Sequence, residues 1–84
     1  MKYNDLRETV NMMNSNDYKD RFRAEFYQVE TRCEKLKAML DKYLYGELSF
    51  KPTCPYNLLH EQYVYMCGYL ECLKKRAELE KVVL

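Results

Sequence analysis

The sequence has no tryptophan, only two glycines and two prolines, and almost no excess of charge of either sign. So little glycine and proline excludes a collagen-like chain or a flexible linker, and an apolar fraction of 48% is too high for a fully disordered chain. The net charge of +1 argues against general nucleic-acid binding, which needs an excess of cations to displace counterions from phosphates. The 84 residues therefore indicate one small globular domain.

Long apolar runs are also missing. The N-terminus has no apolar stretch of signal-peptide length, and no run approaches the roughly 18 residues that a membrane-spanning helix needs. We therefore expect a cytoplasmic protein that is neither secreted nor membrane-bound. In that compartment we expect Cys33, Cys54, Cys67 and Cys72 to be reduced thiols rather than disulfides.

Motifs for catalysis or metal binding are equally scarce. The chain has no glycine-rich phosphate loop, no His-Glu-x-x-His motif and no nucleophile at a recognisable spacing from its one histidine, His60. Cys67 and Cys72 alone approach a zinc-knuckle spacing, because Cys33 and Cys54 are isolated. We expect Cys33 and Cys72 to be small buried apolar residues, and we expect no enzymatic activity, no metal and no cofactor.

The apolar residues that are present predict two long helices. The first covers residues 17–45, where apolar side chains recur at steps of three and four, with Asn16 or Asp17 as N-cap and Gly46 just past the end. At the rise of an α-helix this segment is roughly 43 Å long, so a rod is expected. The stripe that should be buried consists of Tyr18, Phe22, Phe26, Val29, Cys33, Leu36, Leu40 and Leu44.

A connector at residues 46–54 leads to a second helix at 55–82. Gly46, Pro52 and the following Pro55 exclude helix in the connector, while the alternation of Leu48 and Phe50 allows either a short strand or a loop. Pro55 suits the first helical position, with Thr53 or Cys54 as cap. Residues 1–16 form a polar leader, either a short helix or a tail, to which we assign no function.

The second helix carries apolar residues on two faces. One face is enough to cover the first helix, so the other, with Leu58, Tyr65, Tyr69, Cys72 and Leu79, requires a second chain. Gly68 within the helix suggests close approach of a neighbouring backbone or a ligand. The predicted fold is all-α: a long antiparallel helical hairpin that self-associates into a helix bundle as a dimer or larger homo-oligomer.

Cations and tyrosines are the candidate ligand-binding residues. In a hairpin, Lys19, Arg21 and Arg23 face residues 74–76 at the open end, which predicts either an anion site or a salt-bridged surface of little energetic value. Tyrosines offer faces on which a base or a protein partner can pack, and backbone amides at Thr53 could bind an anion. The candidate ligand-binding residues are Tyr18, Arg21, Arg23, Thr53, Tyr65, Tyr69, Lys75 and Arg76.

Several short runs resemble a known family. These are Tyr18-Lys19-Asp20-Arg21-Phe22, Glu34-Lys35-Leu36, Gly46-Glu47-Leu48-Ser49-Phe50, Pro52-Thr53-Cys54-Pro55, Leu58-Leu59, Tyr69-Leu70 and Arg76-Ala77-Glu78. Over residues 17–84 the chain resembles short, mostly uncharacterised proteins of gut tailed bacteriophages, including crAss-like phages. The resemblance implies a phage accessory protein in the cytoplasm of a bacterial host.

Small phage proteins of unrelated families counter host defence by sequestering nucleotide immune signals, which is an analogy of function and not of descent. The first hypothesis is therefore an anti-defence protein that holds a cyclic-nucleotide or ADP-ribose-type signal in a pocket at an oligomer interface. The alternatives are a protein-binding inhibitor or adaptor of a host or phage protein, and an accessory protein of the virion or its assembly.

Overall fold

A computed structural model of the chain describes residues 6–84. A 3₁₀ turn, η1 (Leu6–Thr9), and one α-helical turn, α1 (Val10–Met13), precede two long helices, α2 (Tyr18–Leu44) and α3 (Tyr56–Glu80). No strand occurs in these residues, so the all-α prediction is confirmed there and the connector is a loop. The first five residues of the predicted leader lie outside the described part of the chain.

The start and end of α2 follow the expected capping. The Asp17 carboxylate accepts a hydrogen bond from the backbone amide of Lys19 at 2.9 Å, which satisfies a donor that the first turn leaves unpaired. Beyond the helix, Gly46 has a φ of +68°, in the left-handed region that favours glycine. The Glu47 amide can then donate to the Lys42 carbonyl at 2.8 Å, which closes the helix end.

Both ends of α3 differ from the prediction. Pro55 is itself the N-cap, with no side-chain capping bond, so the expected capping by Thr53 or Cys54 is wrong. At the other end the helix stops at Glu80 because Lys81 turns into the left-handed region, with a φ of 57°. The Val82 amide then donates to the Ala77 carbonyl at 2.9 Å, and Val82 folds back into the core.

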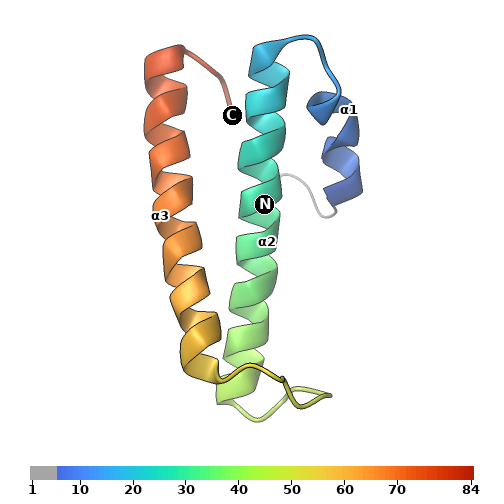
Figure 1. The fold of residues 1–84 in the computed structure, drawn as a ribbon, viewed down its shortest axis with the longest axis vertical. Coiled ribbons are helices and arrows are strands. Elements are labelled where there is room, and N and C mark those ends of the chain that lie inside the picture. Colours follow the sequence, from blue (N-terminus) through green and yellow to red (C-terminus); the bar gives the residue numbers. More distant parts are fainter. Residues whose placement is uncertain (1–5) are drawn as a thin grey trace.

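The two long helices lie side by side and run in opposite directions (Figure 1). The short helices pack on the side of α2 away from α3. The connector joins the end of α2 to the start of α3, at the end of the molecule away from the C-terminus. The overall extents are 43 × 24 × 18 Å, so the chain is a rod. No helix of the described residues combines the length and the apolar character that crossing a membrane requires.

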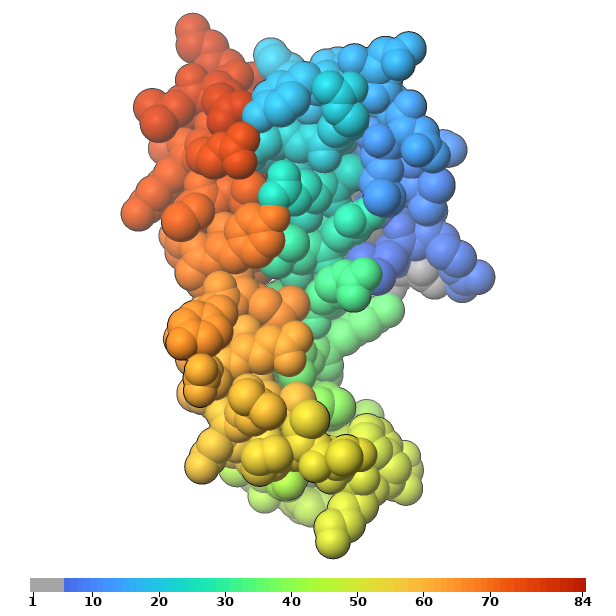
Figure 2. Space-filling view, in the orientation of Figure 1, coloured from blue at the N-terminus to red at the C-terminus, as the bar shows by residue number. Residues whose placement is uncertain are grey.

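The core is concentrated at the end that holds the start of α2 and the end of α3, which is the broad end of the molecule (Figure 2). Tyr18 and Leu44, at the two ends of the stripe that was predicted to be buried, are 47% and 63% exposed, so the prediction is wrong for these two residues. The buried cluster consists of Phe22, Phe26, Tyr27, Leu73, Ala77 and Val82.

The polar leader packs on a second side of α2. There the Gln28 amide donates to the Thr9 hydroxyl at 3.0 Å and contacts the Met13 sulfur, while Thr9 donates to the Leu6 carbonyl at 2.6 Å. Thr9 and Thr31 are both fully buried. The leader from Leu6 onward is therefore a short helical segment fixed to α2.

Candidate functional site

The side of α3 that faces away from α2 is exposed although it is largely apolar. Leu58, Tyr65, Cys72 and Leu79 recur every seven residues along it, and Tyr65 and Leu79 are 69% and 85% exposed. We call this row, with the residues beside it, the outer face of α3. Cys72 lies in the row and is exposed, so the expectation that it is buried is wrong.

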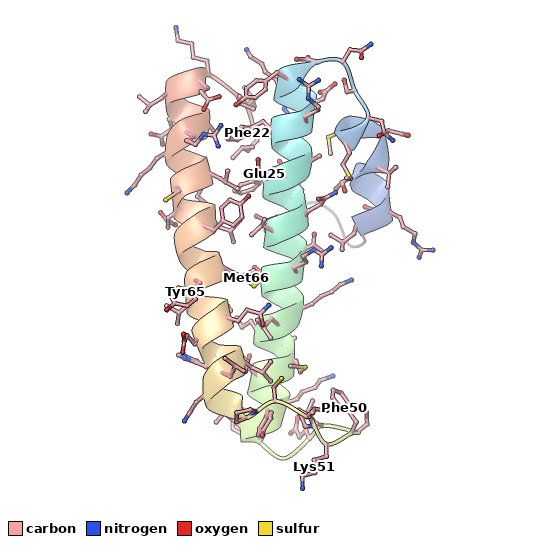
Figure 3. All side chains as sticks on the ribbon, viewed as in Figure 1. Phe22, Glu25, Phe50, Lys51, Tyr65 and Met66 are labelled. Atoms are coloured by element: carbon pink, nitrogen blue, oxygen red, sulfur yellow. The ribbon has the colours of Figure 1, made fainter. Side chains whose placement is uncertain are left out.

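A shallow groove of about 420 Å³ lies on the first half of this face. Its lining is mostly apolar, and the carboxylate of Glu61 and the amide of Gln62 are its polar groups. Tyr65 points away from α2 and Met66 toward it, so the groove opens to solvent (Figure 3). The residues of this α3 groove are Leu58, Glu61, Gln62, Tyr65, Met66 and Tyr69.

Tyr69 links the groove to α2. Its hydroxyl donates a hydrogen bond to the Glu25 carboxylate, and this bond raises the pKa of Tyr69 because it stabilises the protonated phenol. Glu25 projects from α2 toward α3 (Figure 3). The ring of Tyr69 is thereby held at one end of the α3 groove.

Two turns further along α3, Arg76 joins a second polar contact between the helices. Its guanidinium donates to the Glu80 carboxylate at 2.9 Å and to the Tyr18 hydroxyl at 2.9 Å, and it lies 5.0 Å from the centre of the Phe22 ring. Tyr18 in turn donates to Glu80 at 2.6 Å. These bonds lower the pKa of Glu80, chiefly through Tyr18, and raise those of Tyr18 and Arg76.

The remaining candidate residues do not join this arrangement. Arg23 donates to the Val83 carbonyl at 2.7 Å and to Asp20 at 3.0 Å, so it holds the C-terminal tail. Arg21 donates to the Ser15 carbonyl at 2.8 Å, on the side of the leader. Lys75 is exposed on α3.

Thr53 is exposed in the connector at the opposite end of the rod. The structure thus places Tyr18, Tyr69 and Arg76 along the contact between α2 and α3 and Tyr65 beside them, while Arg21, Arg23 and Thr53 lie elsewhere. Within the part of the chain that the structure describes, no three His, Cys, Asp or Glu side chains gather into a group that could hold a metal.

One known protein family matches the chain over both long helices and the α3 groove. The Sequestin family model matches residues 16–79, well over half of the chain. The chain belongs to the Sequestin family. No curated protein and no solved structure matches it. The matched range leaves out most of the leader and the C-terminal tail, so what this Sequestin chain shares with its family is the pair of long helices and the connector.

Inside this Sequestin chain, two thiols meet between the helices. The sulfur atoms of Cys33 and Cys67 are 4.0 Å apart, and burial, with the neighbouring thiol, raises the pKa of Cys33 to about 11. A contact with Cys67 raises the pKa of Tyr63. Nearer the connector, aromatic rings pack between the helices. The ring centre of Tyr56 lies 5.8 Å from that of His60, in a stacked arrangement, and 5.5 Å from that of Tyr43. His60 is thus a packing residue.

A second hollow, of about 370 Å³, lies between α2 and the connector and was not foreseen from the sequence. It brings Lys35 and Lys42 of α2 close to Ser49 and Phe50, the last of which is labelled in Figure 3. Glu61, Gln62 and Met66 of the α3 groove were missed too. For those, the signal was available: they flank the seven-residue repeat that begins at Leu58.

Proposed function

We propose that this protein acts by binding rather than by catalysis, and that it sequesters a nucleotide immune signal of the cyclic-nucleotide or ADP-ribose type. Membership of the Sequestin family supports sequestration, since the family name describes it. The observation that carries the proposal is the α3 groove, where Tyr65 and Tyr69 offer ring faces beside the polar groups of Glu61 and Gln62. Aromatic faces with a few polar groups suit a base and its edge.

The setting of this proposal is a phage protein in the cytoplasm of its bacterial host, active against a defence system. Self-association belongs to the same proposal. The groove is open and shallow on one chain, whereas small-molecule sites usually enclose most of their ligand. A homo-oligomer, formed by the antiparallel hairpin through its exposed helix face, would supply the missing wall.

The test is native mass spectrometry of the protein purified gently from bacteria in which a nucleotide-signalling defence has been triggered. We expect an oligomer that carries extra mass of several hundred daltons per site. Titration calorimetry with a panel of cyclic nucleotides and ADP-ribose derivatives then gives the affinity. An oligomer that neither retains a small molecule nor binds any member of the panel at micromolar concentration contradicts the proposal.

A matched pair of variants tests whether the ligand binds in the α3 groove. Tyr65→Ala removes an exposed ring from the α3 groove, and we expect at least a tenfold loss of affinity, which is about 1.4 kcal/mol. Tyr45→Ala removes a ring of comparable exposure, 77% against 69%, from the C-terminal end of α2, outside the lining of the groove. Equal affinity of both variants would exclude the groove.

The apolar outer face of α3 also fits an inhibitor or adaptor that binds a host or phage protein. Co-purification from infected cells distinguishes this function. A stoichiometric protein partner, with no retained small molecule, would favour the adaptor over the sequestering function.

A further inference from the structure

The middle of the outer face of α3 is a glycine whose open side faces none of the residues that the structure describes. Glycine inside a helix costs about 1 kcal/mol relative to alanine. A Cβ placed on Gly68 would have no described atom within 4 Å, so residues 6–84 do not make the close approach expected from the sequence. Gly68 lies on the same exposed side as Tyr65 and Cys72.

Two charges lie symmetrically about Gly68. Glu61 is seven residues before it and Lys75 seven residues after it, which is two helical turns in each direction. Both are exposed, and neither takes part in the ion pairs found among the described residues. Glu71 and Glu80 already pair with Lys74 and Arg76 respectively.

These positions distinguish two ways of packing a second copy on this face. A parallel pair of α3 helices in register sets Glu61 against Glu61 and Lys75 against Lys75, which repel. An antiparallel pair that crosses at Gly68 sets Glu61 against Lys75 of the second copy, twice over. The apolar repeat is compatible with that crossing, because Leu58 then lies within one residue of the level of Leu79, and Tyr65 within one residue of the level of Cys72.

We propose that a second copy of this chain docks antiparallel on the outer face of α3, with a two-fold axis beside Gly68. This inference rests on the proposed function and deepens it. Lys75 of the second copy reaches the Glu61 end of the α3 groove, so each groove combines rings from one copy with a cation from the other. An anionic ligand is then bound by both chains, and the dimer has two equivalent sites.

Disulfide trapping tests the orientation with a native cysteine. Tyr65→Cys places a thiol within one residue of the level of Cys72 of the second copy, and we expect mild oxidation to link these two thiols in a covalent dimer, identified by peptide mapping. Tyr45→Cys is the control, because Tyr45 is also exposed, at 77%, but lies at the C-terminal end of α2 and not on this face. We expect no dimer linked through that position.

Charge exchange tests the same geometry without oxidation. Glu61→Lys should raise the dimer dissociation constant several-fold in sedimentation equilibrium, and adding Lys75→Glu should restore it, since the opposite charges again face each other. Failure of the double variant to recover overturns the antiparallel arrangement.

The other outcomes are distinct. A link between Cys72 and Cys72 in the unmodified chain shows a parallel pair, and a dimer trapped by neither position uses another face. Each of these overturns this inference while nucleotide binding, measured separately, stands. A protein that remains a monomer at hundreds of micromolar overturns both this inference and the oligomeric part of the proposed function.

Discussion

Arg76, a candidate ligand-binding residue, already makes several contacts within its own chain. Its guanidinium is bonded to Glu80 and to Tyr18 and lies over Phe22. A phosphate that binds Arg76 must compete with the Glu80 carboxylate, whereas Lys75 on the same turn has no such competitor among the ion pairs of the described residues. The two cations are therefore unequal, and Lys75 is the more available to a ligand.

The Glu80 contacts predict a pH dependence of stability. Hydrogen bonds from Tyr18 and Arg76 lower the pKa of Glu80 in the folded state, so its contribution is present above the unfolded pKa and is lost as pH falls through the folded pKa. We expect the difference in free energy of unfolding between the native chain and Glu80→Gln to be larger at pH 7 than at pH 3. Urea denaturation at both values measures it.

Glu78→Gln is the control for this experiment, because Glu78 is exposed on the same helix and no bond to it is found among the described side chains. If both variants differ from the native chain by the same amount at pH 7 and at pH 3, the Glu80 contacts do not contribute to stability.

Among the elements, the short helices of the leader are joined to α2 by the hydrogen bonds of one side chain. Gln28 holds them through Thr9 and Met13. We expect Gln28→Ala to lower the free energy of unfolding by about 1 kcal/mol, because the buried Thr9 hydroxyl loses a donor, and to expose residues 14–16 to protease. Arg32→Ala, an exposed change on the same helix, should do neither. Unchanged protease resistance in Gln28→Ala would show that apolar packing alone holds the leader.

Sequence reasoning located the two long helices, because each has a sustained apolar repeat and clear end signals such as Asp17 and Gly46. It missed the ends that tertiary contacts decide. Lys81 adopts a left-handed conformation that lysine does not favour, and Val82 then reaches the core by folding back. The pattern of residues 81–84 alone does not distinguish this tail from another helical turn.

The candidate site was predictable in part for the same reason. Tyr65 and Tyr69 follow from the second apolar face of α3, since helical spacing places them without knowledge of any partner. The bond between Tyr69 and Glu25 joins residues 44 positions apart in sequence, so it depends on the axial register in which α2 and α3 pack. No local pattern encodes that register, so Glu25 could not be found.

At the scale of the whole molecule, stability is distributed unevenly along the rod. The cluster around Phe22 and Leu73 occupies one end, whereas the connector end carries exposed Leu44 and Phe50. We expect backbone amides of residues 36–44 to exchange with deuterium at least about tenfold faster than those of residues 22–30, because the connector end opens locally at lower cost. Hydrogen exchange read by mass spectrometry measures both segments, and equal protection would contradict this gradient.

Because the core lies at one end of the rod, the residues needed for folding and the residues of the α3 groove are largely different residues. Leu73 and Ala77 must keep their size for the chain to fold, whereas Leu58 and Tyr65 are exposed and do not belong to the buried cluster. Substitutions in the α3 groove therefore leave most of the folding energy untouched. In evolution, such a chain can change the molecule that it recognises at the open half of α3 while inheriting its fold from the other half.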